Sequence, residues 1–205
     1  ADGEPIQYNE FAIVKHNIGE GSFGSVSLAQ NINTHQLAAL KFMSKSRLRK
    51  QRTFARRKML TGLDRVRAEI DIARTVDHRN LVSCLQVLDD PDHDDIIFVM
   101  EYMANGHLMS WDEDVQQFRS DLFPRSASCG GIEEHSARDL FADLVHGLDY
   151  LHSMNIVHRD IKPDNLLLSN EGVLKSVFAC FLAMINLPIA QNRRFWVCRA
   201  HVQSR

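Results

Sequence analysis

Three glycines, Gly19, Gly21 and Gly24, form a Gly-x-Gly-x-x-Gly pattern near the start of the chain. Because glycine has no side chain, the backbone N–H groups of such a turn can approach phosphate oxygens closely. Dinucleotide-binding turns share the pattern, but there it opens a helix and an acidic residue follows about twenty residues later. Here a predicted strand follows, and no acidic residue occurs between Glu20 and Asp64. The pattern favours a glycine-rich hairpin over nucleotide phosphates, with a plain hairpin turn as the alternative.

Lys41 lies within an apolar strand pattern, Ala39-Leu-Lys41. A buried ammonium group needs an opposite charge, because isolating it from water costs several kcal/mol. Glu69, in the next predicted helix, is the natural partner. The pair predicts that Lys41 holds nucleotide phosphates and that Glu69 orients Lys41. The alternative is an edge strand on which only the alkyl part of Lys41 is covered.

The segment His158-Arg-Asp-Ile-Lys-Pro-Asp-Asn165 matches every fixed position of H-R-D-x-K-P-x-N, the catalytic loop of protein kinases. Together with the glycine pattern and Lys41, it makes the chain resemble a Ser/Thr protein kinase. The resemblance implies that Asp160 accepts the substrate hydroxyl proton, that Lys162 neutralises the transferred phosphate and that Asn165 binds Mg²⁺. A lysine at position 162 further implies serine or threonine substrates rather than tyrosine.

The same resemblance implies which residues hold ATP. Met100-Glu-Tyr-Met103 follows a predicted strand and is similar to the gatekeeper and hinge of the family, where the backbone of Glu101 and Met103 would bind adenine. Three residues match positions that enclose the purine, with ordinary core packing as the alternative: Val26, Ala39 and Leu167. The full implied ATP site is Ile18, Gly19, Gly21, Gly24, Val26, Ala39, Lys41, Glu69, Met100, Glu101, Met103 and Leu167. ATP and Mg²⁺ are the expected cofactors, and the expected catalytic residues are Asp160, Lys162 and Lys41.

A closer similarity is to calcium/calmodulin-dependent protein kinase kinases and to kinases that activate AMP-activated-type kinases. It rests on Asp77-His-Arg-Asn-Leu-Val82, on Val87-Leu-Asp-Asp-Pro91 and on a basic insertion. In those kinases an Arg/Pro-rich insertion at this place helps engage substrate kinases. The insertion here lacks proline, and its charged residues are Lys45, Arg47, Arg49, Lys50, Arg52, Arg56, Arg57 and Lys58. A solvated surface loop, a nuclear-import signal and a patch for an acidic partner are the alternatives.

The kinase resemblance covers residues 11–175 and then fails. Kinases continue into Asp-Phe-Gly, whose aspartate holds the principal Mg²⁺, whereas the chain has no Asp or Glu from Gly172 to Arg205. Without that ligand, phosphoryl transfer is expected to fall on the order of a thousandfold or more. We interpret residues 176–205 as the product of a frameshift, a retained intron or a gene-model error. A genuine short isoform, whose tail docks on the helix predicted over 133–152, is the alternative.

Apolar periodicity predicts the elements that must position these residues. A helix is expected over 63–76 with Val66, Ile70 and Ala73 on one face, and residues 112–131 are expected to form a polar loop or a short helix. The second helix, over 133–152, carries the apolar residues Leu140, Phe141, Leu144, Leu148 and Leu151. Strands are expected at 11–14, 25–28, 37–43, 81–88 and 96–102.

The predicted fold class is α+β, a protein-kinase-like fold with two lobes. A five-stranded sheet with one helix forms the N-terminal lobe (11–103), an incomplete helical C-terminal lobe follows (104–175), and a divergent tail ends the chain (176–205). The expected function is ATP-dependent phosphorylation of protein Ser/Thr by a chain that is weakly active or inactive. A nucleotide-binding pseudokinase that acts as an interaction module, and a non-functional fragment, are the alternatives.

Composition narrows the setting. A net charge of −2 and 24% charged residues give no argument for nucleic-acid or membrane binding. The four cysteines are far apart, which argues against a disulfide framework or a zinc site and for a cytoplasmic location, with the nucleus as the alternative. The expected partner is a protein substrate, another kinase among the candidates, and calmodulin would act only through segments outside this chain.

Overall fold

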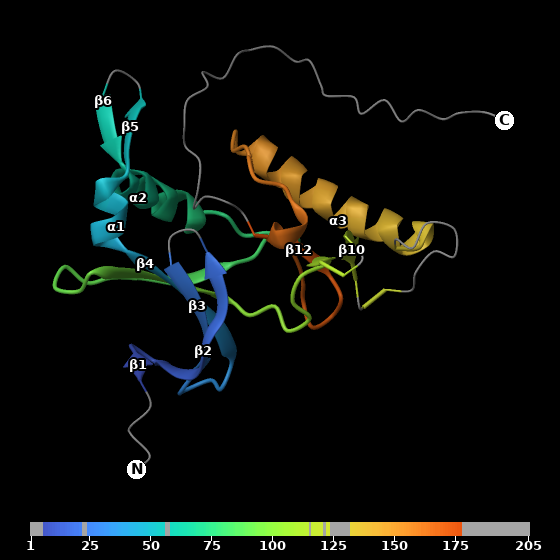
Figure 1. Ribbon diagram of the computed structural model, residues 1–205, viewed down its shortest axis with the longest axis horizontal. Helices are drawn as coiled ribbons and strands as arrows, with labels where there is room; N and C mark the ends of the chain where they lie inside the picture. The colour runs from blue at the N-terminus through green and yellow to red at the C-terminus, as the bar shows by residue number, and fades with distance from the viewer. Residues whose placement is uncertain are drawn as a thin grey trace.

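The largest element of the computed structural model is a six-stranded antiparallel sheet in the order β1-β2-β3-β4-β8-β7 (Figure 1). The structure describes residues 6–21, 24–55, 58–114, 116–120, 122–123 and 132–177. The five predicted strands are confirmed, and a short edge strand, β1, is added to them. The strands are β1 (Gln7–Tyr8), β2 (Phe11–Gly21), β3 (Gly24–Asn31), β4 (Leu37–Ser44), β7 (Cys84–Asp89) and β8 (Asp95–Glu101).

The two sides of this sheet cover different cores. The register pairs Val26 with Lys41 and Ala39 with Met100, so these four side chains share one side, here called the inner face. Helix α2 (Gly62–Ala73) packs on the inner face through Met43, Leu48, Leu63, Val66, Ile70, Ile96 and Phe98. The opposite side, here called the outer face, has a separate core made of Phe11, Ala29, Ala38, Leu40, Ile97 and Val99.

Helix α2 begins at a capping box. Asp64 N–H donates to Thr61 Oγ1 at 3.1 Å, and Thr61 N–H donates to the Asp64 carboxylate at 2.9 Å. These bonds satisfy N–H groups that the first helical turn leaves without partners. The predicted apolar face is confirmed, because Val66, Ile70 and Ala73 are buried. Glu69 is buried on the same helix.

The basic stretch after β4 forms regular secondary structure, and most of its described basic residues are exposed. It forms helix α1 (Lys45–Lys50) and a hairpin of β5 (Arg52–Ala55) and β6 (Lys58–Thr61), which projects beyond α1 and α2 in Figure 1. Lys45, one of the charged residues of the predicted basic insertion, is only 3% exposed. The physical reason is local compensation, because its ammonium group meets a carboxylate and two carbonyls from the turn between β7 and β8.

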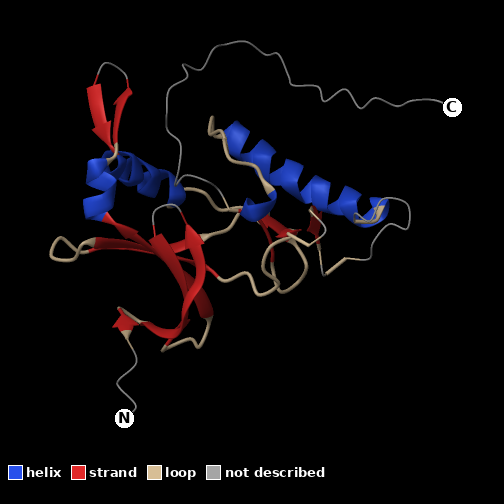
Figure 2. Cartoon of the chain, viewed as in Figure 1, coloured by secondary structure: helices blue, strands red, loops and turns tan. Residues whose placement is uncertain are grey.

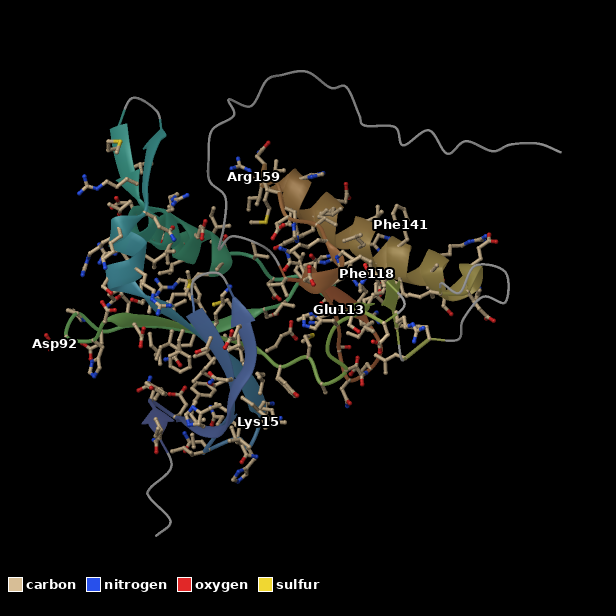
Figure 3. The ribbon with its side chains drawn as sticks, viewed as in Figure 1. Lys15, Asp92, Glu113, Phe118, Phe141 and Arg159 are labelled. Carbon is tan, nitrogen blue, oxygen red and sulfur yellow. The ribbon has the colours of Figure 1, made fainter. Side chains whose placement is uncertain are left out.

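The second half of the described chain is organised around helix α3 (Glu134–Ser153), with short strands beside it (Figure 2). The predicted helix is confirmed, with Leu140 and Leu151 buried. Phe141 is a correction, because it is 66% exposed and lies outside the buried side of α3 (Figure 3). The remaining elements are β9 (Ser110–Asp112), β10 (Gln117–Arg119), the 3₁₀ helix η1 (Pro163–Asn165), β11 (Leu166–Leu168) and β12 (Leu174–Ser176).

These short strands add to the incomplete helical lobe that the sequence predicts. β9 and β10 pair as an antiparallel hairpin at the start of the segment predicted to be a loop or a short helix. β11 and β12 pair in the same way directly after η1. Residues 124–131, which belong to the predicted loop, lie outside the described residues, and so does the tail from residue 178 onward.

Several contacts connect the two halves. The Lys175 ammonium lies 2.7 and 2.8 Å from the two carboxylate oxygens of Glu101, and the Val82 N–H donates to the Ser176 carbonyl at 3.0 Å. α3 approaches the segment before β7 closely at Gly147, where a Cβ atom would stand 3.0 Å from the Asn80 carbonyl oxygen. Within the described residues, no helix has the length and apolar character needed to cross a membrane.

Candidate active site

Four of the predicted ATP-binding residues of the sheet share its inner face. Lys41 and Val26 are register partners in β4 and β3, and Ala39 and Met100 are partners in β4 and β8. Ile18 falls where the pairing of β2 with β3 is irregular, and its side chain is 37% exposed. The sheet therefore brings most of the predicted purine and phosphate contacts to one surface.

The glycine pattern forms the end of a hairpin and not the start of a helix. Gly19 pairs with Val26 and Gly21 pairs with Gly24 across β2 and β3, whereas residues 22–23 at the tip lie outside the described residues. A Cβ atom at Gly24 would stand 1.8 Å from the Phe42 carbonyl oxygen, so the close approach of β3 to β4 requires glycine there. At Gly19 the nearest neighbour would be 3.9 Å away, which is an ordinary contact. The geometry supports the hairpin interpretation over the dinucleotide-binding one.

Lys41 in β4 and Glu69 in α2 are close enough for their charges to interact. Burial lowers the pKa of Lys41, and the charge of Glu69 opposes that change. Burial raises the pKa of Glu69 to about 8, against the attraction of Lys41, Arg65 and Arg159. Glu69 Oε2 is buried without a hydrogen-bond partner in the described part of the chain. A buried acceptor left without a partner is costly, so this site favours a further cation or donor beside Glu69.

The catalytic loop brings its three predicted residues together. Asn165 Nδ2 donates to the Asp160 carboxylate oxygen Oδ2 at 2.8 Å and to the Asp160 backbone carbonyl at 2.7 Å. Lys162 Nζ lies 3.3 Å from the same Oδ2, and its side chain is 46% exposed. Asp160 therefore has a fixed carboxylate beside a lysine that is free to reorient at the surface.

The residues on either side of Asp160 hold the loop in an unusual conformation. Arg159 has a φ of 67°, a backbone angle that costs energy for a residue with a side chain. It lies at the end of α3 on the side toward α2 (Figure 3), close enough to lower the pKa of Glu69. His158 is buried, and burial lowers its pKa. Its Nε2 lies 2.5 Å from Ser176 Oγ. The loop is thus supported by a residue, Ser176, that no sequence motif singles out.

The predicted hinge connects the sheet to this loop. Met103 is buried, and its carbonyl accepts the Gly106 N–H at 3.0 Å. His107 then bridges Leu167, which places the predicted purine contact of the second half next to the hinge. The side chain of Glu101 has a role that the motif does not predict, because it accepts hydrogen bonds from the Ser83 N–H and the Lys175 ammonium.

A cavity of about 560 Å³ lies elsewhere. Its lining includes Ser25, Ser27, Phe42 and Ser44, whose register places them on the outer face, opposite Lys41. None of the predicted ATP-binding residues except Gly24 lines it. In the described residues, no group of three or more His, Cys, Asp or Glu side chains is placed to hold a metal.

Comparison with known proteins supports the sequence resemblance. A family described as "Protein kinase domain" matches residues 12–177. A probable serine/threonine-protein kinase of Dictyostelium discoideum is 38% identical over 167 residues, which is 82% of this chain and 21% of that protein. SNF1-activating kinase 1 of Saccharomyces cerevisiae is 34% identical, over 82% of this chain and 14% of its own length.

A calcium/calmodulin-dependent protein kinase kinase of Caenorhabditis elegans is 33% identical over 183 residues, covering 83% of this chain and 31% of that protein. The chain thus spans well under half the length of each of these relatives. The family match covers both the inner face of the sheet and the catalytic loop, the two parts that carry the candidate site. The chain belongs to the protein kinase family.

Proposed function

We propose that this chain binds ATP between the inner face of the sheet and the catalytic loop and transfers a phosphoryl group weakly, or not at all, to Ser/Thr residues of proteins. The observation that carries the proposal is the convergence of Asp160, Lys162 and Asn165 in one hydrogen-bonded cluster. Such an arrangement of a carboxylate, a cation and an amide suits phosphoryl transfer to a hydroxyl group.

Asp160 is suited to receive the substrate proton. Its Oδ2 is held by Asn165 and Lys162, which leaves Oδ1 as the oxygen that we propose accepts the hydroxyl proton. A positioned carboxylate of this kind contributes about 10² to 10⁴ in rate as a general base. Lys162 is exposed enough to turn from Asp160 toward a phosphate.

The ATP phosphates would lie beside Lys41 and beneath the glycine hairpin, with the purine between the hinge and Leu167. Glu69 Oε2 has no hydrogen-bond partner among the described residues, and a nucleotide that moved the Lys41 ammonium toward it would supply a donor. Mg²⁺ would bind the Asn165 side-chain oxygen, because the amide nitrogen already faces Asp160. Bound Mg²⁺ would supply charge neutralisation between the phosphates.

The fit for the metal is incomplete. The sequence supplies no Asp or Glu from Gly172 to Arg205, where the family carries its principal metal ligand. This observation favours a second candidate function, a nucleotide-binding pseudokinase that acts through interactions. We propose another protein kinase as the substrate or partner. The relative named as a calcium/calmodulin-dependent protein kinase kinase supports this choice.

Transfer of radiolabel from ATP to a protein substrate tests the catalytic proposal. We expect slow, Mg²⁺-dependent incorporation that is lost in Asp160→Asn and kept in Asp164→Asn, a matched change at an exposed aspartate of the same loop. Equal incorporation by the two variants would contradict the role of Asp160. ATP binding without any incorporation would select the pseudokinase.

A further inference from the structure

Ser176 is the last residue of β12 and is only 2% exposed. Its backbone joins the segment before β7, because its N–H donates to the Asn80 carbonyl at 2.9 Å and its carbonyl accepts the Val82 N–H at 3.0 Å. The side chain points the other way, toward the catalytic loop, where Oγ meets His158 Nε2 at 2.5 Å. The residue therefore links the loop to the frame of the molecule.

The hydrogen bonds around Ser176 form a closed ring. The Asp160 N–H donates to His158 Nδ1 at 3.4 Å, and on this basis we assign the lone pair to Nδ1 and the proton to Nε2, which faces Ser176 Oγ. The serine hydroxyl faces the Asn165 carbonyl at 3.5 Å. Asn165 Nδ2 closes the ring by donating to Asp160.

Burial makes the hydroxyl important. Both His158 and Ser176 are 2% exposed, so water cannot readily replace the Ser176 hydroxyl, which meets the imidazole together with the backbone of Val177. The neighbouring Val177 N–H donates to the Asn165 carbonyl at 2.8 Å, which places a backbone contact beside the side-chain one. The start of the loop at His158 and its end at Asn165 are thus both tied to residues 176–177.

We propose that the Ser176 hydroxyl is a positioning group for Asp160 and Asn165, because it fixes the ring of His158 and through it the backbone of Asp160. Ser176 does not touch the reacting atoms. The functional meaning of this role rests on the proposed function of Asp160 and Asn165, whereas the hydrogen-bonded ring itself can be measured without any activity.

Nitrogen-15 NMR of the histidine rings, combined with amide hydrogen exchange, tests the proposal on the full chain. In the wild type we expect His158 to be protonated at Nε2 and bare at Nδ1, with its signal assigned from its loss in His158→Gln. In Ser176→Ala we expect a displaced ring signal and exchange of the Asp160 amide about tenfold faster, the change when one hydrogen bond is lost. Ser176→Thr keeps the hydroxyl and should restore both readouts.

The control is Ser27→Ala, a buried serine with the same 2% exposure on the outer face of the sheet. This change should leave the His158 ring and the Asp160 amide unaltered. A wild-type ring protonated at Nδ1 would overturn the proposal even if Ser176→Ala fails to fold. An unchanged His158 signal in a folded Ser176→Ala would overturn it too.

Absence of ATP binding by the wild type would contradict the proposed function but not the ring. The two failures are therefore distinguishable.

Discussion

Lys41, which is half-buried, and Lys45, which is buried, lie four residues apart in the sequence, and different groups surround their charges. Lys45 is fully compensated: its Nζ lies 2.7 Å from Asp89 Oδ1 and donates to the backbone carbonyls of Asp90 and His93. Burial lowers the pKa of Lys41, and its partner Glu69 keeps a buried oxygen without a hydrogen bond in the described structure. A buried charge stabilises a fold when all its hydrogen-bonding groups have partners. A buried charged pair that keeps a group without a partner is instead suited to binding a ligand.

The surroundings explain the difference. The acidic turn between β7 and β8 wraps the start of α1, where Asp94 accepts hydrogen bonds from the Ser44 and Ser46 hydroxyls at 2.7 and 2.9 Å. Lys45 is therefore enclosed by a rigid local frame. Lys41 lies in the middle of β4 and faces a helix and a catalytic loop that come from distant parts of the chain. Its surroundings include Arg65 and Arg159, two further cations whose charges act on Glu69.

The largest expected effect is on Lys45. Replacing Lys45 by Met leaves the Asp89 carboxylate without its buried cationic partner. The Asp89 side chain is 30% exposed, so water partly solvates the carboxylate in the variant. We expect a loss of about 2 to 3 kcal/mol in the free energy of unfolding, less than for a fully buried pair. Denaturant unfolding beside Lys50→Met, an exposed lysine of the same helix, measures it. Equal losses in the free energy of unfolding of the two variants would show that the buried contacts of Lys45 do not stabilise the fold.

The next effect concerns the pH dependence that Glu69 imposes. Its pKa in the folded chain, about 8, is above the ordinary value of 4.5, so the folded state holds the proton more tightly. The resulting stability is present below pH 4.5 and is lost as the pH rises through about 8. Between pH 5 and 8 we expect the wild type to lose at least about 1.4 kcal/mol, the equivalent of one pKa unit.

Urea unfolding across that range should show a much flatter profile for Glu69→Gln, which remains neutral. Glu133→Gln is the control, because this exposed carboxylate precedes α3 and should leave the profile of the wild type intact. Identical profiles for Glu69→Gln and the wild type would show that Glu69 is ionised at neutral pH. The contrast between the two lysine sites would then lose its basis.

A smaller effect on stability is expected at Lys41. Burial already disfavours its ammonium group, so Lys41→Met should change the free energy of unfolding by no more than about 1 kcal/mol in the absence of nucleotide. Thermal unfolding beside Lys45→Met gives the direct contrast. If Lys41→Met lost as much free energy of unfolding as Lys45→Met, both lysines would have a mainly structural role.

The smallest effect is expected at Ser46, which is exposed and shares Asp94 with Ser44. Ser46→Ala should cost about 0.5 kcal/mol or less, since Ser44 and the Ser46 N–H still hold the carboxylate. Calorimetric unfolding of this variant measures how far the remaining hydrogen bonds to Asp94 compensate for the lost hydroxyl. A loss above about 2 kcal/mol would instead make Ser46 a principal contact.

Sequence patterns anticipate the residues that act through local motifs. Strand alternation and the catalytic-loop spacing assign Lys41, Asp160 and Asn165 to their predicted elements, and the register then shows which face of the sheet carries Lys41. The Lys45 frame is different, because its partners follow more than forty residues later and no spacing rule connects them. Ser176 likewise depends on a pairing with Asn80 and Val82 that only the folded chain creates.

Burial of individual helix positions is also set by the fold as a whole. Phe141 is apolar and lies one position after the buried Leu140, yet the neighbouring strands cover only the side that Leu140 occupies. Periodicity thus predicts the existence of α3 but not the width of its buried side. The β9–β10 hairpin has no strong alternating pattern, which explains why the same stretch reads as a loop.

Thermal unfolding with saturating ATP, with and without Mg²⁺, tests the central claim that the inner face and the catalytic loop form a nucleotide site. A ligand at a hundred times its Kd stabilises a protein by roughly 2.7 kcal/mol, a shift of a few degrees in Tm. We expect this shift in the wild type and in Lys15→Met, an exposed lysine of β2 (Figure 3), and its loss in Lys41→Met. An ATP-induced shift of equal size in Lys41→Met, or none in the wild type, would contradict the account.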